Sequence, residues 1–296
     1  MCRNVFYHRI GGVQHVADAR VPLDSRCAGT TRQAMRITDA IERILAHMPV
    51  RLADPGCDRV VHGDPQQPLR GIAVTFLASR AVLERAAAAG ANFVVTHEPT
   101  WYNHHDHTDW LAGDPVQQAK ARLIEGNAQV IWRLHDHVHQ GWPDLIADGV
   151  LQALGWKAQV VGDQTCIVQL PAQPLRTLAQ HVRTSLGSAA VRVVGDLDAP
   201  VSRVVFLPGA CGGRRQIDLL KQPGIDVVFC GESAEWETCE YVRDAVAMGQ
   251  RKALIVAGHA NSEEAGMAHV GALIHGWFPE VPVLHIPTGD PFQLIA

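Results

Sequence analysis

The sequence predicts an α/β protein of two halves, in which mixed sheets are covered by helices. Short apolar runs alternate along the chain with segments whose apolar residues recur at helical spacing. This alternation is typical of sheets that carry helices on their faces. The 296 residues, 47% of them hydrophobic, are enough for one large or two medium domains, since a domain usually has roughly 100–200 residues.

The first half is expected to begin with an amphipathic helix within residues 31–48, followed by a buried strand at 71–79. Ser79 is a suitable N-cap for the next helix, because its hydroxyl can accept from a free backbone amide, and Gly90 is a suitable stop. A strand at 92–96 comes next. The remaining elements expected in this half are a helix at 115–125, a strand at 128–134 and a helix near 143–154.

The alternation continues along the rest of the chain. Strands are expected at 165–170, 189–195, 203–209, 225–231, 253–259 and 281–287, and helices at 174–186, 214–221, 235–248 and 263–277. We interpret the organisation as an N-terminal extension of poor order (1–31), a first α/β half (32–155), a connecting segment (156–202) and a second α/β half (203–296).

Composition argues against several classes of protein. With 26 basic and 30 acidic residues and a net charge of -4, the chain offers no broad basic field, so we expect no nucleic-acid partner. The seven cysteines are scattered without a CxxC pair, which argues against a disulfide framework and favours the reducing cytoplasm. We see no continuous apolar stretch of about 20 residues that would cross a membrane, and the first residues lack the apolar core of a secretory signal.

Histidines and carboxylates follow several of the expected strands. His97 and Glu98 come directly after the strand at 92–96, and "HDHVH" (135–139) follows the next one. Glu232 follows the strand at 225–231, and His259 and Glu263 follow "ALIVAG". Ligands gather beyond the carboxyl ends of strands in open α/β sheets. Imidazole and carboxylate together suit Zn, Mn, Fe and similar ions, so the pattern predicts a metal site.

Other interpretations remain open for some of these groups. The exposed-looking cluster in the polar stretch after Pro99 fits surface histidines (His104, His105 and His107). "HDHVH" could form a structural network in which an imidazole donates to a carbonyl, His135 in particular. The Gly-rich "GACGGRR" (209–215) could bind phosphate or form a tight turn, and it lacks the lysine of a P-loop.

The order of motifs resembles the Ngg-interacting-factor-like (NIF3-like) family of dinuclear-metal proteins, also described as GTP cyclohydrolase I type 2. The resemblance covers about residues 32–296 and is carried by "VVHGDPQQPLRGIAV", "GANFVVTHEP", "RLHDHVH", "VRVVGDLDAPVSRVVFLPGACGG", "GIDVVFCGE", "AGHANSEEAGM" and "PTGDPF". It implies two divalent metal ions per chain (Zn, Fe, Mn, Co or Ni) and a ring-shaped homohexamer. Ile274 and Trp277 fit such an interface, but core packing explains them equally well.

In this family the metal ligands lie in a His-His-Pro loop, a His-Thr-Asn-Leu-Asp loop and a Gly-His-x-x-Ser-Glu loop. The resemblance therefore implies His97, Glu98, His139, His259 and Glu263 as ligands. Glu98 stands where the family has its second histidine and His139 where it has aspartate, so a nitrogen and an oxygen ligand have been exchanged. If the register of the middle loop slips, Asp136 and His137 are the alternative ligands.

The resemblance also points to residues that would manage protons. Glu232 keeps the acidic residue that the family carries after the corresponding strand, whereas Trp236 occupies the approximate position of a family histidine. Glu232 and Glu235 are the expected catalytic residues, with Glu237 as an alternative base. A solvated helix face is the competing interpretation for Glu235, Glu237 and Glu240.

The function expected is a metal-dependent hydrolase acting on an unknown small molecule, because two divalent ions can acidify water and polarise a substrate oxygen. The reaction would be of the cyclohydrolase, amidohydrolase or phosphoesterase kind. The alternative is a non-catalytic metal-binding or regulatory protein that stores, senses or delivers ions.

Overall fold

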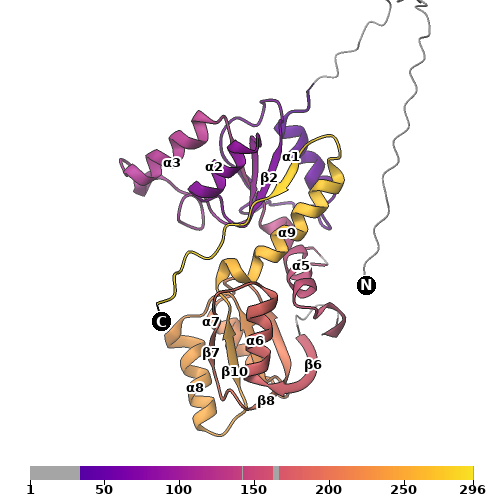
Figure 1. The fold of residues 1–296 in the computed structure, drawn as a ribbon, viewed down its shortest axis with the longest axis vertical. Coiled ribbons are helices and arrows are strands. Elements are labelled where there is room, and N and C mark those ends of the chain that lie inside the picture. The colour runs from indigo at the N-terminus through magenta and orange to yellow at the C-terminus, as the bar shows by residue number, and fades with distance from the viewer. Residues whose placement is uncertain (1–33, 142, 163–166, 296) are drawn as a thin grey trace, which may run out of the picture. The chain divides into compact units, whose positions relative to one another are not determined.

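The computed structural model describes residues 34–141, 143–162 and 167–295, which form a mixed α/β fold with two mixed sheets (Figure 1). The predicted fold class is therefore confirmed. The extension expected at 1–31 lies outside the described residues. Among the helices described, none is long and apolar enough to cross a membrane.

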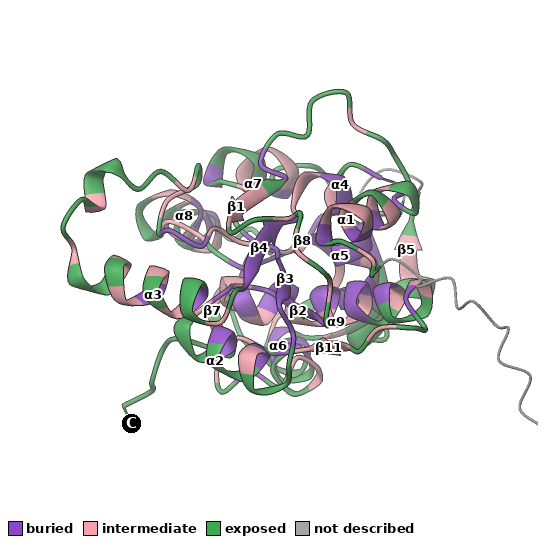
Figure 2. Ribbon diagram, turned by 90° about the horizontal axis from the view of Figure 1, so that it is seen from above, coloured by how far each residue is buried: buried purple, intermediate pink, exposed green. Residues whose placement is uncertain are grey.

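The first sheet has the strand order β1-β4-β3-β2-β11. Four of its strands run parallel, and β1 pairs with β4 in the antiparallel direction. The three central strands are buried along their whole length, as expected of parallel strands covered on both faces (Figure 2). The strands are β1 (Arg59–His62), β2 (Ile72–Thr75), β3 (Phe93–Thr96), β4 (Val130–Arg133) and β11 (Val283–His285).

Helices cover both faces of this sheet. One face packs against α1 (Ile37–Ala46) and α9 (His259–Trp277), the other against α2 (Arg80–Ala88) and α3 (Pro115–Gly126). The hydroxyl of Ser79 accepts from the amide of Val82 at 3.3 Å, which confirms the predicted cap of α2. Because helices cover both faces of the sheet, the side chains on both faces of β2 and β3 are buried. This explains why "IAVT" and "FVVT" are continuous apolar runs without polar alternation.

The second sheet has the strand order β5-β6-β8-β9-β10-β7. Its centre is parallel (β8, β9 and β10), and the flanking pairs are antiparallel. The strands are β5 (Val160–Val161), β6 (Ile167–Pro174), β7 (Arg192–Val194), β8 (Pro200–Leu207), β9 (Val227–Cys230) and β10 (Ala253–Val256). The helices that accompany it are α5 (Leu145–Ala153), α6 (Leu175–Ser185), α7 (Gly213–Leu220) and α8 (Glu240–Ala247). The short helices are α4 (Asp136–His139), η1 (Asp109–Leu111), η2 (Lys157–Gln159) and the π-helical turn η3 (Glu235–Cys239).

Helix α9 connects the two sheets. It begins directly after β10 and packs against α5 and against β2 and β11 of the first sheet (Figure 1). Gly149 on α5 and Gly266 on α9 permit this close crossing, since a Cβ at Gly266 would lie 2.6 Å from the carbonyl oxygen of Ile146. Ile274 is fully buried in the core, and Trp277 stacks on His47 with ring centroids 4.7 Å apart, so core packing accounts for both positions.

The division of the chain differs from the expected one in two places. Residues 156–202, expected to connect the halves, contribute β5, β6 and β7 to the second sheet. At the other end, β11 leaves the second half and pairs with β2. The order of the elements along the chain suggested that residues 203–296 form one sheet by themselves. Instead, α9 runs from the second sheet to the first, so β11, which follows it, pairs with a strand of the first sheet. In addition, α9 begins at His259, four residues before its expected start.

Candidate metal centre

The first candidate ligands lie at the end of β3. The amide of His97 donates to the carbonyl oxygen of Thr75 (3.2 Å) and the amide of Glu98 to that of Phe76 (2.8 Å), so the neighbouring strand holds this turn. The imidazole of His97 is fully buried, and its Nδ1 lies 3.2 Å from the carbonyl oxygen of Leu134. With Nδ1 facing a carbonyl, Nε2 keeps its lone pair for a ligand.

Burial lowers the pKa of His97 well below its ordinary value, and the neighbouring imidazoles of His139 and His135 lower it further. A neutral imidazole is the form that binds metal. The side chain is therefore held in the protonation state that a ligand needs.

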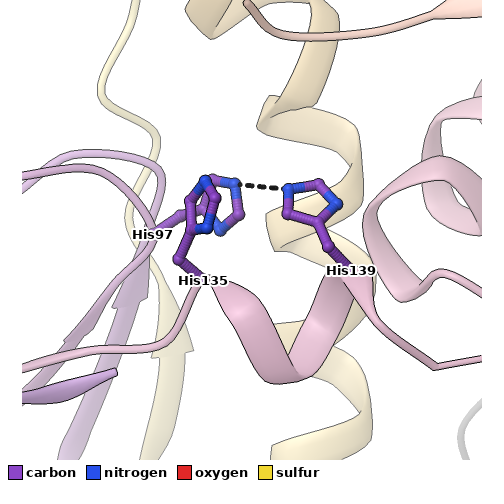
Figure 3. Close-up of side chains that lie close together, drawn as sticks. All are labelled: His97, His135 and His139. Atoms are coloured by element: carbon purple, nitrogen blue, oxygen red, sulfur yellow. Dashed lines mark hydrogen bonds between the residues drawn. The ribbon is translucent and has the colours of Figure 1, made fainter. Parts of the chain in front are cut away.

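Two more imidazoles come from the short helix α4 and the residue before it. His135 and His139 are four residues apart, so they lie on the same side of this single turn. The His135 ring stacks on His97 with centroids 4.6 Å apart, and Nε2 of His139 lies 3.2 Å from Nε2 of His97 (Figure 3). One ring nitrogen from each of the three histidines lies within 4.8 Å of the others.

Asp144 fixes the ring of His139. Its Oδ2 lies 2.9 Å from His139 Nδ1, while its Oδ1 accepts from the amide of Ala147 as the N-cap of α5. Burial lowers the pKa of His139, but the hydrogen bond and charge of Asp144, together with the charges of Glu263 and Glu98, raise it above its ordinary value. This carboxylate–imidazole pair directs Nε2 toward His97, as carboxylates that accept from the other ring nitrogen of a ligand histidine do in metal sites.

The alternative ligands of the middle loop point elsewhere. Nδ1 of His137 lies 2.7 Å from Oδ2 of buried Asp58, on the opposite side of α4 from His139. The carboxylate of Asp136 accepts from the amide of Cys57 (2.8 Å) and lies 2.8 Å from Nδ1 of His135. Both side chains therefore support the loop, and neither belongs to a group with metal-binding spacing among the described residues.

The last two candidate ligands lie in the first turn of α9. Glu263 is 2% exposed, and its Oε2 lies 3.1 Å from Nε2 of His259 and 3.6 Å from Nε2 of His97. Oε2 makes no hydrogen bond of good geometry. Gly209, with a φ of +71°, makes room for this carboxylate, because a Cβ there would overlap Oε1. A buried carboxylate oxygen left without a hydrogen bond is costly unless a cation satisfies it.

Glu98 completes a second group. One oxygen of Glu98, one of Glu263 and a nitrogen of His97 lie within 4.8 Å of one another. Glu98 Oε1 also lies 3.5 Å from Nε2 of His259, and its Oε2 lies 3.9 Å from the buried guanidinium of Arg133. The two groups share His97. The donor atoms are therefore those of a candidate nitrogen and oxygen site for divalent metal.

His259 is strongly influenced by the carboxylates around it. Burial lowers its pKa, but the close contact and charge of Glu263, and then the charges of Glu98 and Glu232, raise it to about 9. Glu232 Oε1 lies 2.9 Å from His259 Nδ1 and thus orients the ring. A bound cation would replace the proton on this imidazole.

The remaining residues predicted around the site are farther from these groups. Glu235 is 81% exposed and pairs with Arg192 at 3.4 Å, and Trp236 is also exposed. The histidines at 104, 105 and 107 are exposed, although Nε2 of His104 lies 3.4 Å from Sγ of Cys57. The Gly-rich turn leads into α7, where Arg214 pairs with Asp218.

Two cavities adjoin the candidate ligands. One of about 700 Å³ is lined by Phe76, Glu98, Glu232 and His259 among others, and one of about 520 Å³ by Glu98, His135, His139 and Glu263 among others. Glu235 lines neither cavity. A small molecule could therefore reach the candidate ligands from the first cavity, beside Glu232.

Three residues of the centre are not among the ligands and catalytic residues expected from the sequence. For His135 the sequence left open a structural network, but the residue lies in a group with metal-binding spacing. Its separation of four residues from His139 was the available signal. Asp58 and Asp144 act through contacts across the fold or a loop, and only the position of Asp144 before a helix was visible in the sequence.

Fold and site together define a two-sheet α/β protein with a candidate metal centre of histidines and glutamates. Residues 35–291 match the family Duf34/NIF3 (NGG1p interacting factor 3), and the chain belongs to this family. No curated protein sequence gives a significant match.

Solved structures support the same fold. Staphylococcus aureus protein SA1388 is similar with a TM-score of 0.70 and 17% identity, covering 88% of this chain and 99% of that one. A Bacillus cereus protein related to NIF3 gives 0.68 and 18%, over 88% and 99% of the two chains. Reduced HcgD from Methanocaldococcus jannaschii gives 0.62 and 14%, over 86% and 97%. At these identities the likeness concerns the fold alone.

Proposed function

We propose that the protein binds two divalent metal ions and uses them as a hydrolase. The observation that carries the proposal is Oε2 of Glu263, a buried carboxylate oxygen without a hydrogen bond that faces His97 and His259. A buried carboxylate oxygen that has no hydrogen bond and faces two imidazoles has the chemistry of a site completed by a cation. The proposed ligands are His97, Glu98, His139, His259 and Glu263, with His135 as an additional nitrogen donor. His259 belongs to neither group with metal-binding spacing, and it is included because its Nε2 lies 3.1 Å from Oε2 of Glu263 and 3.5 Å from Oε1 of Glu98.

Within this proposal the protein's own groups have distinct tasks. Asp144 and Glu232 orient the imidazoles of His139 and His259, and Arg133 holds the turn after β3 by donating from Nε to the carbonyl oxygen of His97 at 3.1 Å. When bound, the ions would supply Lewis acidity for hydrolysis of an amide, a phosphoester or a purine-type ring.

Glu232 is the better candidate for proton transfer in this reaction. It lines the larger cavity and is half exposed, so it can exchange protons with a substrate and with solvent. Glu235 was the other expected base, but its pairing with Arg192 and its absence from the cavity wall favour Glu232.

A non-catalytic role in storing, sensing or delivering metal is the second candidate. It is favoured by the near-complete burial of His97 and Glu263, which would suit tight retention of an ion. By family resemblance we also propose a homo-oligomer, possibly a hexamer, and a cytoplasmic location. Light scattering of the purified protein measures the oligomer.

The test of the hydrolase is turnover of a panel of amides, phosphoesters and purines after reconstitution with Mn, Fe, Co, Ni or Zn. We expect activity that chelator and His259→Ala both abolish and that His62→Ala retains. His62 is a suitable control because it pairs with the exposed Glu125, away from the candidate ligands. Stoichiometric metal without turnover on any member of the panel would favour the non-catalytic role.

A further inference from the structure

The larger cavity has a mostly apolar wall with aromatic residues at two of its sides. Phe76, Leu77, Pro291 and Phe292 contribute to it, together with Arg192. Its volume of about 700 Å³ exceeds that of a single aromatic ring system, so a small organic molecule fits.

Phe76 forms the side next to the candidate ligands. Its ring is buried and meets the His259 ring edge-on, with centroids 5.3 Å apart, and lies 6.2 Å from the ring of His97. A molecule that packs on Phe76 is therefore adjacent to both imidazoles.

Phe292 forms another side, on the segment that follows β11. Thr288 anchors this segment, since its hydroxyl accepts from the amide of Leu77 at 2.9 Å and its amide donates to Glu264 at 2.9 Å. Asp290 accepts from Nδ2 of Asn261 at 2.7 Å. The backbone is thus fixed on both sides of the cavity while the Phe292 ring is 78% exposed. An exposed aromatic ring on an anchored segment gains most from a ligand that covers it.

One cationic side chain of the wall, Arg192, is available to pair with an anion. Arg192 lies on the edge strand β7, where it pairs with Val256 of β10. Val256 precedes His259 by three residues, so Arg192 lies near the start of α9. Its ion pair with Glu235, at 3.4 Å, joins two exposed side chains, and such pairs contribute little. A ligand anion could therefore replace Glu235 as the partner of Arg192 at small cost.

The carboxylates of the same wall are already engaged. Glu232 faces His259, and Asp290 accepts from Asn261 and from the amide of Phe292 at 2.9 Å. Glu98 lies between two cationic partners, with Oε1 3.5 Å from Nε2 of His259 and Oε2 3.9 Å from the guanidinium of Arg133. A cationic ligand would have to displace these partners, whereas an anion need displace only an exposed glutamate.

We propose that this cavity binds an aromatic organic anion, with its ring against Phe76 and Phe292 and its carboxylate, sulfonate or phosphate paired with Arg192. That such a molecule is the substrate rests on the proposed function. That it binds does not, because none of these three side chains belongs to the candidate ligand set.

The test uses two fluorescent probes that differ in charge. Anilinonaphthalene sulfonate is an aromatic anion, and N-phenyl-1-naphthylamine is its neutral counterpart. Both are titrated into the full-length, EDTA-treated protein, so that binding is measured without metal. We expect Arg192→Gln to weaken sulfonate binding about fivefold and leave the neutral probe unchanged. Phe292→Ala should weaken both probes, by about tenfold.

Arg243→Gln is the matched control, because Arg243 is likewise exposed and ion-paired, with Glu240, but does not line the cavity. Sulfonate binding that is the same in Arg192→Gln, Phe292→Ala and the unaltered protein would overturn this inference. If the unaltered protein binds no metal on reconstitution but the probes behave as expected, the proposed function alone is overturned. The two failures are therefore distinguishable.

Discussion

Replacing Glu263 with glutamine removes a buried charge while keeping the shape of the side chain. In the metal-free protein the carboxylate lies 3.1 Å from His259 Nε2 and is the main group that raises the pKa of that imidazole against the effect of burial. The pKa rises from 6.5 to about 9. One pKa unit corresponds to about 1.4 kcal/mol, so the linked stabilisation is at most about 3–4 kcal/mol.

The sign of the effect follows from the direction of the shift. Because the folded pKa of His259 lies above its unfolded value, the stabilisation is fully present below about pH 6.5 and is lost as the pH rises through about 9. We therefore expect Glu263→Gln to lower the free energy of unfolding by about 1–3 kcal/mol at pH 6 and by much less at pH 10.

Urea denaturation in EDTA at both pH values measures this difference. Glu125→Gln is the control, because its exposed pairing with His62 should contribute less than about 1 kcal/mol. An equal destabilisation by Glu263→Gln at pH 6 and pH 10 would refute the assigned coupling between Glu263 and His259.

Two further predictions concern how the ligands are held. Asp144→Asn should weaken metal binding about 10- to 100-fold, measured by competition with a chelator. The asparagine amide would hold the His139 ring less firmly than the carboxylate does but could still cap α5. An unchanged metal affinity would mean that the ring needs no such support. Gly209→Ala should abolish metal binding by displacing the carboxylate of Glu263, whereas Gly212→Ala, with a similar positive φ but open space around its Cβ, should bind normally despite comparable backbone strain. Elemental analysis of the two variants compares them, and equal metal content would contradict the steric argument.

Much of the fold was accessible from the sequence because its signals are local. Buried parallel strands read as short apolar runs, and Ser79 caps α2 as its position indicated. The pairing of β11 with β2 was not accessible, because it depends on α9 crossing to the first sheet. Strands within 156–202 were expected, but their place in the second sheet was not, because β6 and β7 join it by antiparallel pairing with strands that come later in the chain.

Part of the candidate centre could also be predicted from the sequence, because local signals mark the ends of the strands. The positions of His97, Glu98, His259 and Glu263 after strands follow from strand ends alone. Which histidine of "HDHVH" turns inward depends on the single turn of α4 and on Asp58, which lies far away in the sequence and holds His137 on the opposite side.

The metal content of the purified protein decides whether the candidate centre binds ions, and elemental analysis for Mn, Fe, Co, Ni and Zn measures it in parallel with His97→Ala and Glu263→Ala. We expect close to two ions per chain in the unaltered protein and loss of bound metal in both variants, since His97 belongs to both candidate groups and Glu263 to one that shares His97. No bound metal in the unaltered protein, even after incubation with each ion, would contradict this expectation.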